Sequence, residues 1–486
     1  MAELLRIENI TKRFGNTLAN DRVSFSVEDG AIHGIVGENG AGKSTIMKIF
    51  YGMYPADSGT IYFHGNKVTI AAPQDAIALG VGMVHQHFML VPTLTIWENV
   101  ILGSEPKALR LSKETICESL NKIQNEFGFN LNLDSKIEDL SVGLQQQVEI
   151  LKILYRNAKT LILDEPTAVL TPQEVDVLFT KLAQLNKQGK TIIVITHKLK
   201  EILKWTSQVT VMRQGKVVET ADTKNLTSEI LAEKIIGRKQ KPLPKANQSS
   251  NDEKPCLEFK KVSLKNKLNQ LSFKVFPGEI VGIAGIDGNG QNEIVDLLAK
   301  ISKCDGGEIS AQKSIAIIPP DRHTQAVVLE FSVSENAIFG LQRLKQFGEN
   351  ILLSKQKVTD FTNKLIEEFD IRPRETEVAF SSLSGGNQQK LVVGRETEKK
   401  APCLVACHPT RGVDIGAIEF IHSHLIDLKN KGVGILLFSS ELEEILALSD
   451  RVLVIYQGEI VGEKAASQTN EKELGLWMTG GKNATA

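Results

Sequence analysis

Residues 37–44 read Gly37-Glu38-Asn39-Gly40-Ala41-Gly42-Lys43-Ser44 and match in full the G-x-x-x-x-G-K-[ST] pattern of a phosphate-binding loop. An apolar strand is predicted before the loop, over residues 31–36, and a helix after it, from about residue 46. This context suits the motif, because amide groups of the loop and of the helix start point at phosphate oxygens. We expect Lys43 to reach the terminal phosphates of a nucleoside triphosphate and Ser44 to ligate Mg²⁺.

The same loop occurs a second time, 248 positions later, as Gly285-Ile286-Asp287-Gly288-Asn289-Gly290-Gln291-Asn292, without the lysine and the serine. A second landmark also repeats: Leu140-Ser141-Val142-Gly143 recurs 243 positions later as Leu383-Ser384-Gly385-Gly386. A near-constant offset indicates a duplicated domain rather than a solenoid, whose period is roughly 20–50 residues. The first half is therefore expected to hydrolyse a nucleotide, and the second is not.

The repeat divides the 486 residues into two domains, which we place at residues 1–238 and 255–486. Residues 239–254 form a polar, proline-bearing stretch that is predicted to be a linker, because few of its side chains could enter a core. Contact of its lysines with anionic lipid is the alternative interpretation.

The charge and the cysteine content of the chain limit the classes of function that it can have. The formal net charge is −1 and the pI is near 6.8, so nothing favours a nucleic-acid partner. Residues 1–14 are too polar for a signal peptide, and no run of about 18 apolar residues could span a bilayer, so we expect an intracellular chain. The five scattered cysteines are typical of reduced thiols, and Cys403 and Cys407 lack the second ligand pair of a zinc site.

Two acidic residues follow a buried strand in the first half. Residues 160–163 are the apolar run Thr-Leu-Ile-Leu, and Asp164 and Glu165 come directly after it. Adjacent carboxylates at the end of a buried strand are costly unless metal and water meet them. We therefore assign Asp164 to the Mg²⁺ shell and Glu165 to polarising the attacking water. Without the phosphate-binding loop, an ordinary pair of surface acids would be the simpler interpretation.

Polar residues are also predicted after two more strands. His197 follows the apolar strand 191–196, and we expect it to hydrogen-bond the γ-phosphate or the attacking water rather than to serve only a structural role. Gln86 follows the short apolar segment 81–84 and is assigned to both Mg²⁺ and water. His85 and His87 flank Gln86, but no third ligand stands near them in the sequence, which disfavours a separate metal site.

The stretch Leu383-Ser384-Gly385-Gly386-Asn387-Gln388-Gln389 resembles the signature of ABC ATPases, and the phosphate-binding loop, Gln86, Asp164-Glu165 and His197 stand in that family's order. The resemblance covers almost the whole chain. It implies an α/β fold with two P-loop NTPase domains of the ABC ATPase type. Each would contain a RecA-like core, an antiparallel β subdomain and a helical subdomain.

The resemblance also implies ATP and Mg²⁺ as ligands. The implied catalytic residues are Lys43, Gln86, Glu165 and His197, and the implied Mg²⁺ ligands are Ser44, Gln86 and Asp164. The residues implied to bind ATP are Phe14, which would stack on adenine, Gly37, Glu38, Asn39, Gly40, Ala41, Gly42, Lys43, Ser44, Thr45, Ser384, Gly385, Gly386 and Asn387.

The second half departs from that pattern. Cys407, His408 and Ser440 stand where the first half has Asp164, Glu165 and His197. ABC domains resemble one another in pairing head to tail, with each ATP between one P-loop and the other domain's signature. The resemblance therefore implies that the intact P-loop meets the intact signature, and that the altered signature Ser141-Val142-Gly143-Leu144 meets the degenerate loop.

The fused pair of domains, with Pro409-Thr410-Arg411-Gly412-Val413-Asp414-Ile415-Gly416, resembles the ATP-binding subunit of bacterial importers for ribose-type sugars and nucleosides. The stretch His85-Gln86-His87-Phe88-Met89-Leu90-Val91-Pro92 is most similar to the nucleoside-importing branch, and a simple sugar is the alternative cargo. The resemblance implies a peripheral subunit on the cytoplasmic face of the membrane. It would bind membrane-spanning permease subunits near Gln86, and through them an extracytoplasmic substrate-binding protein.

A soluble twin-ABC translation factor is the alternative from another class. Such proteins resemble this chain in domain number, but they usually carry two intact sites and a long charged helical linker. The short, proline-bearing linker and the single intact site disfavour this alternative.

Overall fold

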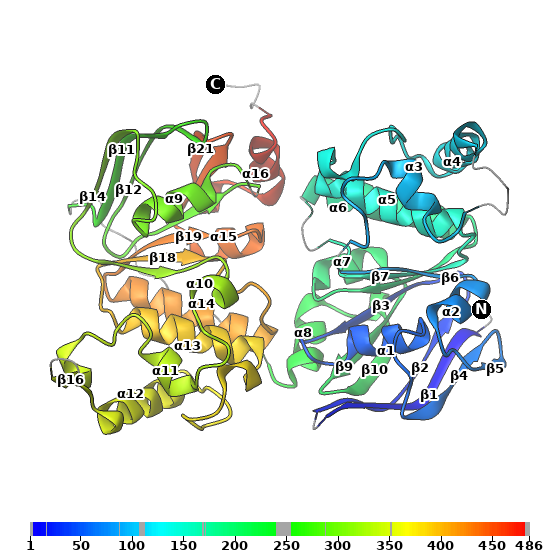
Figure 1. Ribbon diagram of the computed structural model, residues 1–486, viewed down its shortest axis with the longest axis horizontal. Coiled ribbons are helices and arrows are strands. Elements are labelled where there is room, and N and C mark those ends of the chain that lie inside the picture. Colours follow the sequence, from blue (N-terminus) through cyan, green and yellow to red (C-terminus); the bar gives the residue numbers. More distant parts are fainter. Residues whose placement is uncertain are drawn as a thin grey trace. The chain divides into compact units, whose positions relative to one another are not determined.

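The computed structural model describes residues 3–15, 17–86, 88–105, 112–167, 170, 172–239, 254–286, 288–349 and 352–481. The chain divides into two compact units, Met1–Gln240 and Lys241–Ala486 (Figure 1). Apart from its two end residues, the predicted linker 239–254 lies outside the described residues.

The first unit is built on a six-stranded sheet of order β10-β9-β3-β8-β7-β6. Its strands are β3 (Ile32–Gly37), β6 (Val81–Val84), β7 (Thr160–Asp164), β8 (Thr191–Ile195), β9 (Gln208–Arg213) and β10 (Lys216–Asp222). All but β10 run parallel, and β3, β6, β7 and β8 are buried along their whole length. Continuous apolar runs suit such strands, because both faces of the sheet are covered. The parallel arrangement brings the carboxyl ends of β3, β6, β7 and β8 to one edge.

A second, antiparallel sheet of order β2-β1-β4-β5 contributes to the first unit. Its strands are β1 (Glu3–Phe14), β2 (Thr17–Glu28), β4 (Ser58–Phe63) and β5 (Asn66–Val68). In β2 the side chains of Val23, Phe25 and Val27 are buried and alternate with exposed serines, as expected for a sheet with one covered face.

Helices complete the first unit. They are α1 (Lys43–Phe50), α2 (Pro73–Ala78), α3 (Ile96–Ile101), α4 (Lys113–Phe127), α5 (Val142–Tyr155), α6 (Pro172–Lys187), α7 (Leu199–Trp205) and α8 (Ser228–Ile236), with 3₁₀ turns η1 (Ile137–Asp139) and η2 (Thr223–Asn225). Helices α3, α4 and α5 share one apolar cluster with β7 and β8, through side chains such as Ile96, Leu120 and Leu151. This cluster joins a helical region to the α/β core.

The second unit repeats the central sheet in the order β15-β18-β19-β13-β20-β21. Its strands are β13 (Ile280–Ala284), β15 (Ile315–Ile318), β18 (Cys403–Cys407), β19 (Gly434–Phe438), β20 (Arg451–Tyr456) and β21 (Glu459–Ala465). Each strand corresponds to one in the first unit, in the same order and with the same single antiparallel edge.

The antiparallel part of the second unit is smaller. Its sheet has the order β12-β11-β14, with β11 (Leu257–Leu264), β12 (Leu268–Val275) and β14 (Gly306–Ala311). Within the described ranges no strand corresponds to β5 of the first unit, and a two-residue hairpin, β16 (Gly348–Glu349) and β17 (Leu352–Leu353), is added elsewhere.

The helices of the second unit follow the pattern of the first. They are α9 (Gln291–Leu298), α10 (Arg322–Gln325), α11 (Val333–Ala337), α12 (Lys355–Glu368), α13 (Gly385–Thr397), α14 (Ile415–Asn430), α15 (Leu442–Leu448) and α16 (Glu471–Met478), with 3₁₀ turns η3 (Lys345–Phe347), η4 (Phe380–Ser382) and η5 (Ala466–Gln468). In the described part of the chain, no helix combines the length and the apolar character that crossing a membrane requires. Each unit thus has the α/β core, antiparallel part and helical part that we predicted.

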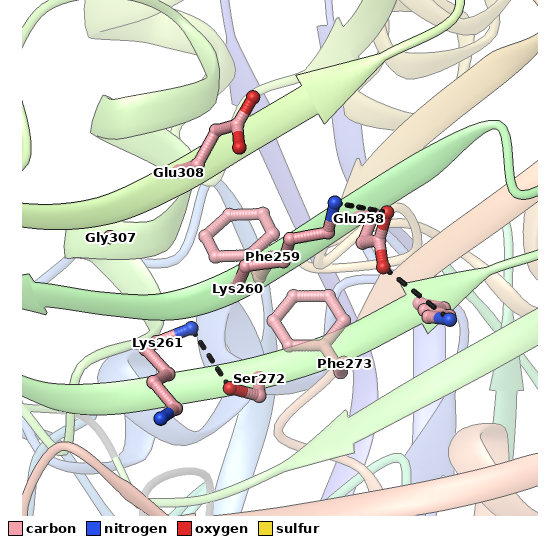
Figure 2. Close-up of a pocket in the computed structure, with 9 residues that line it drawn as sticks. Glu258, Phe259, Lys260, Lys261, Ser272, Phe273, Gly307 and Glu308 are labelled. Atoms are coloured by element: carbon pink, nitrogen blue, oxygen red, sulfur yellow. Dashed lines mark hydrogen bonds and ion pairs between the residues drawn. The ribbon is translucent and has the colours of Figure 1, made fainter.

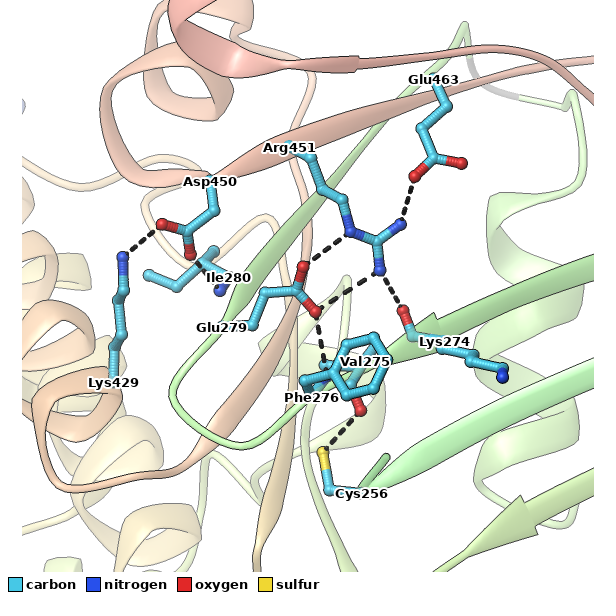
Figure 3. Close-up of polar contacts among 10 residues, drawn as sticks. All are labelled: Cys256, Lys274, Val275, Phe276, Glu279, Ile280, Lys429, Asp450, Arg451 and Glu463. Carbon is cyan, nitrogen blue, oxygen red and sulfur yellow. Dashed lines mark hydrogen bonds and ion pairs between the residues drawn. The ribbon is translucent and has the colours of Figure 1, made fainter. Parts of the chain in front are cut away.

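A polar network holds β13, the strand before the second glycine loop, in place (Figure 3). Arg451 Nε donates to Oε1 of the buried Glu279 at 2.6 Å, and Nη1 donates to Glu463 Oε1 at 2.7 Å. Lys429 Nζ pairs with Asp450 Oδ1 at 2.6 Å. These contacts tie the start of β13 to β20 and α14.

The three-stranded sheet carries a pocket of about 730 Å³ on its polar side (Figure 2). Both Lys260 and Lys274 pair there with Glu258, at 3.3 and 3.4 Å. None of the predicted site residues lines this pocket, so it has no part in the candidate site.

Candidate functional site

The phosphate-binding loop joins β3 to α1 and depends on two glycines in the left-handed region. Gly40 has φ +80° and Gly42 has φ +92°. A Cβ atom at Gly42 would lie 2.4 Å from the carbonyl oxygen of Ala19, so both conformation and space require glycine there. The loop delivers Lys43 as the first residue of α1.

Lys43 is buried over the loop. Its Nζ donates to the carbonyl oxygens of Gly37, at 2.8 Å, and Glu38, at 2.9 Å. Burial lowers the pKa of Lys43, and the Glu165 and Asp164 carboxylates oppose that shift. The single cation of the loop thus lies among its carbonyls and beside the two acidic residues.

Ser44 and Asp164 meet at the base of the loop. Ser44 Oγ donates to Asp164 Oδ1 at 2.8 Å. Asp164 Oδ2 is buried and has no hydrogen-bond partner among the described residues, and burial raises the pKa of this carboxyl. Mg²⁺ prefers oxygen ligands, and this site offers a hydroxyl oxygen beside a carboxylate oxygen that is buried without a hydrogen bond. These two residues therefore fit a Mg²⁺ ion that also takes phosphate oxygens and water.

Glu165 lies next to Asp164 in a strained conformation, with φ +50°. Its N–H donates to the carbonyl of Ile195 at 2.9 Å, and its Oε1 lies 3.2 Å from His197 Nδ1. Burial raises the pKa of Glu165, but the hydrogen bond and charge of His197, with that of Lys43, outweigh this and hold the pKa below its usual value. The carboxylate is therefore ionised and available as a hydrogen-bond acceptor.

Gln86 follows β6, whose parallel neighbour β7 ends in Asp164, and it lies exposed at the same edge of the sheet. His85 packs its ring edge-on against Tyr51 at 5.9 Å between centroids, and burial lowers its pKa. His87 lies outside the described residues. Packing against Tyr51 gives His85 a structural role.

A small pocket of about 150 Å³ lies beside Gln86, and sequence reasoning did not identify it. Glu149 on α5 is buried there, with its pKa raised by burial, and its Oε1 accepts the Met89 N–H at 2.6 Å. Lys152 Nζ donates to the Met89 carbonyl at 2.9 Å. The spacing of Glu149, Lys152 and Arg156, three and four positions apart, was the available signal, but a solvated helix face has the same spacing.

Phe14 ends β1 at the tip of the β1–β2 hairpin and is 43% exposed. Its ring packs edge-on against Tyr54 at 5.2 Å, and Lys12 Nζ lies 5.4 Å from its centroid. In the second unit, β11 and β12 have eight residues each, against twelve in β1 and β2. That described hairpin turns after Leu264, so it ends before a position that could match Phe14.

The degenerate loop of the second unit keeps the backbone of the intact one. Gly288 and Gly290 have φ values of +91° and +118°, and α9 begins at Gln291 as α1 begins at Lys43. Gln291 Oε1 is buried without a hydrogen-bond partner among the described residues, and Asn289 Oδ1 accepts the Gln457 N–H at 2.8 Å. Asp287 lies outside the described residues. The second loop therefore has the backbone shape of the intact loop but lacks its lysine.

The end of β18 differs from the end of β7 only in its side chains. Cys407 is fully buried, and burial raises the pKa of its thiol far above the usual value, so the group stays protonated. His408 has φ +45°, and its N–H donates to the carbonyl of Phe438 at 2.8 Å. The Ser440 N–H donates to His408 Nδ1 at 3.2 Å. No carboxylate stands at either position.

Both signatures open a helix with a serine cap. Ser384 Oγ accepts the Asn387 N–H at the start of α13, and Ser141 Oγ accepts the Leu144 N–H at the start of α5, each at 3.4 Å. Asn387 Nδ2 also donates to Ser384 Oγ, at 2.9 Å. Gly385 and Gly386 lie in the first turn of α13, where unpaired backbone N–H groups face outward.

The structure thus brings Lys43, Ser44, Asp164, Glu165 and His197 together within the first unit and places Gln86 at the same edge of the sheet. Phe14 stands apart on the antiparallel sheet, and Ser384 to Asn387 belong to the second unit.

Comparisons with known proteins agree with this architecture. The ABC transporter family model matches residues 20–168 and 268–411. The chain is 41% identical to the nucleoside import ATP-binding protein NupA of Lactococcus lactis subsp. cremoris, over 98% of both chains. It is 40% identical to the guanosine import ATP-binding protein NupO of Bacillus subtilis, over 99% of this chain and 98% of that one. The ribose import ATP-binding protein RbsA of Bacillus subtilis is 34% identical, over 98% and 100%. The chain therefore belongs to the ABC transporter family, as an ATPase with two ABC domains.

Proposed function

We propose that this ATPase drives the import of a nucleoside, and that ATP is hydrolysed at the P-loop of the first unit only. The proposal that only the first unit hydrolyses ATP rests on one contrast. Ser44 and Asp164 form a pair at 2.8 Å, whereas the protonated Cys407 stands at the matching strand end of the second unit. A buried neutral thiol cannot replace a carboxylate as a ligand of Mg²⁺.

In this proposal each polar residue of the first unit has one task. Lys43 donates to the terminal phosphate oxygens, while Ser44, Asp164 and Gln86 hold Mg²⁺. When bound, Mg²⁺ neutralises charge on the phosphate oxygens.

Glu165 accepts a hydrogen bond from the attacking water and orients it for in-line attack. His197 keeps that carboxylate ionised and in place, at 3.2 Å, and contacts the γ-phosphate. Phe14 stacks on the adenine ring, a role supported by its exposed face at the hairpin tip.

We further propose that the signature residues Ser384, Gly385, Gly386 and Asn387 bind the phosphates of ATP. The N-terminus of α13, a helix of 13 residues, supports this, because its free N–H groups and dipole favour negative charge.

The cargo is proposed from the relatives. NupA and NupO are named as nucleoside and guanosine import proteins and share 41% and 40% identity with this chain, against 34% for the ribose import protein RbsA. A nucleoside is therefore the first candidate, and a ribose-type sugar is the second.

Membrane-spanning permease subunits are the proposed partners, with an extracytoplasmic substrate-binding protein acting through them. The pocket beside Gln86 supports a contact there, because Glu149, Lys152 and Arg156 surround it with both signs of charge. The chain would then be a peripheral protein on the cytoplasmic face of the membrane. No nucleic-acid partner is proposed.

The test is transport by the complex that this chain forms with membrane-spanning permease subunits and a substrate-binding protein. Guanosine or another nucleoside should be taken up in an ATP-dependent manner, and Glu165→Gln should abolish that uptake. Uptake of ribose without nucleoside uptake would favour the sugar alternative. Failure of the chain to co-purify with any membrane subunit would favour the soluble translation-factor class.

A further inference from the structure

Two neighbouring side chains, Tyr54 and Lys12, hold the ring of Phe14. Tyr54 follows α1 and packs edge-on against the ring, with 5.2 Å between the centroids and 76° between the planes. Lys12 Nζ lies 5.4 Å from the centroid of the same ring and pairs with Asp57 Oδ1 at 3.0 Å. Phe14 is nevertheless 43% exposed, so part of its ring remains open to a ligand.

The hairpin that carries Phe14 is attached to the phosphate-binding loop of the same unit. Asn20 on β2 is fully buried, and its Nδ2 donates to the carbonyl of Gly42 at 3.1 Å. The next residue, Asp21, donates its N–H to the carbonyl of Gly215 at 2.8 Å. The ring and the loop therefore belong to one hydrogen-bonded framework within the first unit.

One contact beside the hairpin is common to both units. In the first unit Asp57 Oδ2 accepts the Arg13 N–H at 2.7 Å, and in the second unit Asp305 Oδ2 accepts the Lys265 N–H at 2.7 Å. This shared contact aligns the two hairpins residue by residue. It belongs to the fold rather than to a ligand site, because the second hairpin keeps it without an aromatic residue at its tip.

The residues around the exposed ring differ between the units. Lys12 and Leu264 each come one position before the N–H donor of the shared contact, and Tyr54 and Ser302 each come three positions before its aspartate. The turn after β11 reads Lys265-Asn266-Lys267 and contains no aromatic residue. The second unit thus lacks the ring and both side chains that hold it. A side chain needed for folding alone has no reason to be lost together with the ring.

We propose that Tyr54 and Lys12 are positioning residues for the adenine of ATP, because they hold the Phe14 ring in the orientation that receives the base. This rests on the proposed stacking of adenine on Phe14. Edge-to-face aromatic pairs and cations near a ring have preferred geometries, so both contacts restrict the ring. A ring that is already restricted loses less conformational freedom when a base stacks on it. The two residues therefore strengthen the binding of the base and not that of the phosphates.

The test compares ATP with inorganic tripolyphosphate, which carries the phosphates without the base. Both dissociation constants are measured by calorimetric titration of the full-length chain in a Glu165→Gln background, in which ATP should not be hydrolysed. Tyr54→Ser and Lys12→Leu introduce the residues of the second unit. Each should weaken ATP binding about three- to tenfold and change tripolyphosphate binding less than about twofold. Tyr54→Phe keeps the ring and should retain the parental ATP affinity.

Tyr62→Ser is the matched control. Tyr62 lies on β4 of the same antiparallel sheet, and its ring centroid is 4.3 Å from the guanidinium carbon of Arg6, near the other end of β1 from Phe14. This variant should leave both affinities unchanged. Phe14→Ala tests the stacking itself, and it should weaken ATP binding selectively by at least as much as Tyr54→Ser.

Equal weakening of ATP and tripolyphosphate binding by Tyr54→Ser or Lys12→Leu would mark a purely structural role and overturn the assignment of that residue. An unchanged ATP affinity in either variant would overturn it as well, and so would a Tyr54→Phe variant as weak as Tyr54→Ser. If Phe14→Ala does not weaken ATP binding selectively, the stacking is wrong and the positioning role falls with it. If Phe14→Ala does so and Tyr54→Ser does not, the stacking stands and only the role of Tyr54 is lost.

Discussion

Glu165 and His408 share one backbone position in the two units. Their φ values are +50° and +45°, and their N–H groups donate to the ends of the neighbouring strands, to Ile195 at 2.9 Å and to Phe438 at 2.8 Å. The strained conformation has thus been kept in the second unit although the carboxylate has been lost. Backbone geometry is therefore maintained by strand packing, whereas hydrolysis depends on the side chain that this geometry presents.

Lys43→Ala should abolish ATP turnover, because the loop loses its only cation over the terminal phosphates. Steady-state phosphate release by the purified complex is the measurement, and Gln291→Ala is the matched control in the second unit. The control should change turnover little, since that loop carries no charge at this position. More than about a tenth of the parent rate in Lys43→Ala would contradict the active-site assignment.

Glu165→Gln should retain ATP binding and lose hydrolysis, because the amide keeps a hydrogen-bonding side chain but is a far weaker base. Equilibrium binding of ATP and single-turnover hydrolysis would be measured on the same preparation. The two domains should stay closed around ATP in this variant. If it bound ATP no better than Lys43→Ala and gave no trapped closed state, Glu165 would not be the hydrolytic carboxylate.

Gly385→Asp should stop turnover for two reasons. The new carboxylate would repel the γ-phosphate, and its Cβ would lie 2.9 Å from Arg322 Nη2, so it would also neutralise that cation. Gly143→Asp is the control, and phosphate release should survive it apart from any loss of closure. Loss of activity in Gly143→Asp alone would mean that each half completes its own site.

The first unit should lose stability on acidification because of His33. This residue is fully buried in β3, its Nε2 bonds Thr210 Oγ1 at 2.8 Å, and burial lowers its pKa from 6.5 to about 4. The unfolded state therefore binds the proton more tightly. The neutral ring contributes stability that is present above pH 6.5 and is lost as pH falls toward 4, by about 3 kcal/mol in all.

His33→Val should remove most of that pH dependence, since Val281 occupies the matching strand position of the second unit. Urea unfolding of the parent and the variant at pH 7 and pH 4.5 would measure the effect. An equal loss of unfolding free energy in both proteins would rule out His33 as the cause.

Arg451→Gln should destabilise the second unit by about 3–5 kcal/mol, because it leaves the buried Glu279 carboxylate without its partner. Adding Glu279→Ala should restore most of the loss, since Gln208 and Ala31 stand at the matching positions of the first unit. Thermal or urea unfolding of the single and double variants is the measurement. A double variant as unstable as the single one would show that the ion pair is not the source.

The sequence alone determined the duplication, the α/β architecture of both units and the half in which the phosphate-binding residues are intact. This was possible because glycine spacing, buried apolar strands and the residues directly after them are local features of the chain. The roles of individual residues, from Phe14 to Asn387, stay predictions that the variants above test.

Only the tertiary structure revealed which charged side chains lie beside the two signatures, where a Cβ atom at Gly386 would be 2.6 Å from Asp414 Oδ2 and one at Gly143 would be 2.6 Å from Glu174 Oε1. Arg322 is separated from Gly385 by 63 positions, and Glu174 from Gly143 by 31, so no local pattern links them. The shorter hairpin of the second unit and the buried Glu149 beside Gln86 also depend on strand register and packing. Such contacts depend on how segments that are distant in the sequence pack in a common core. A sequence motif contains information only about residues that are close together in the chain.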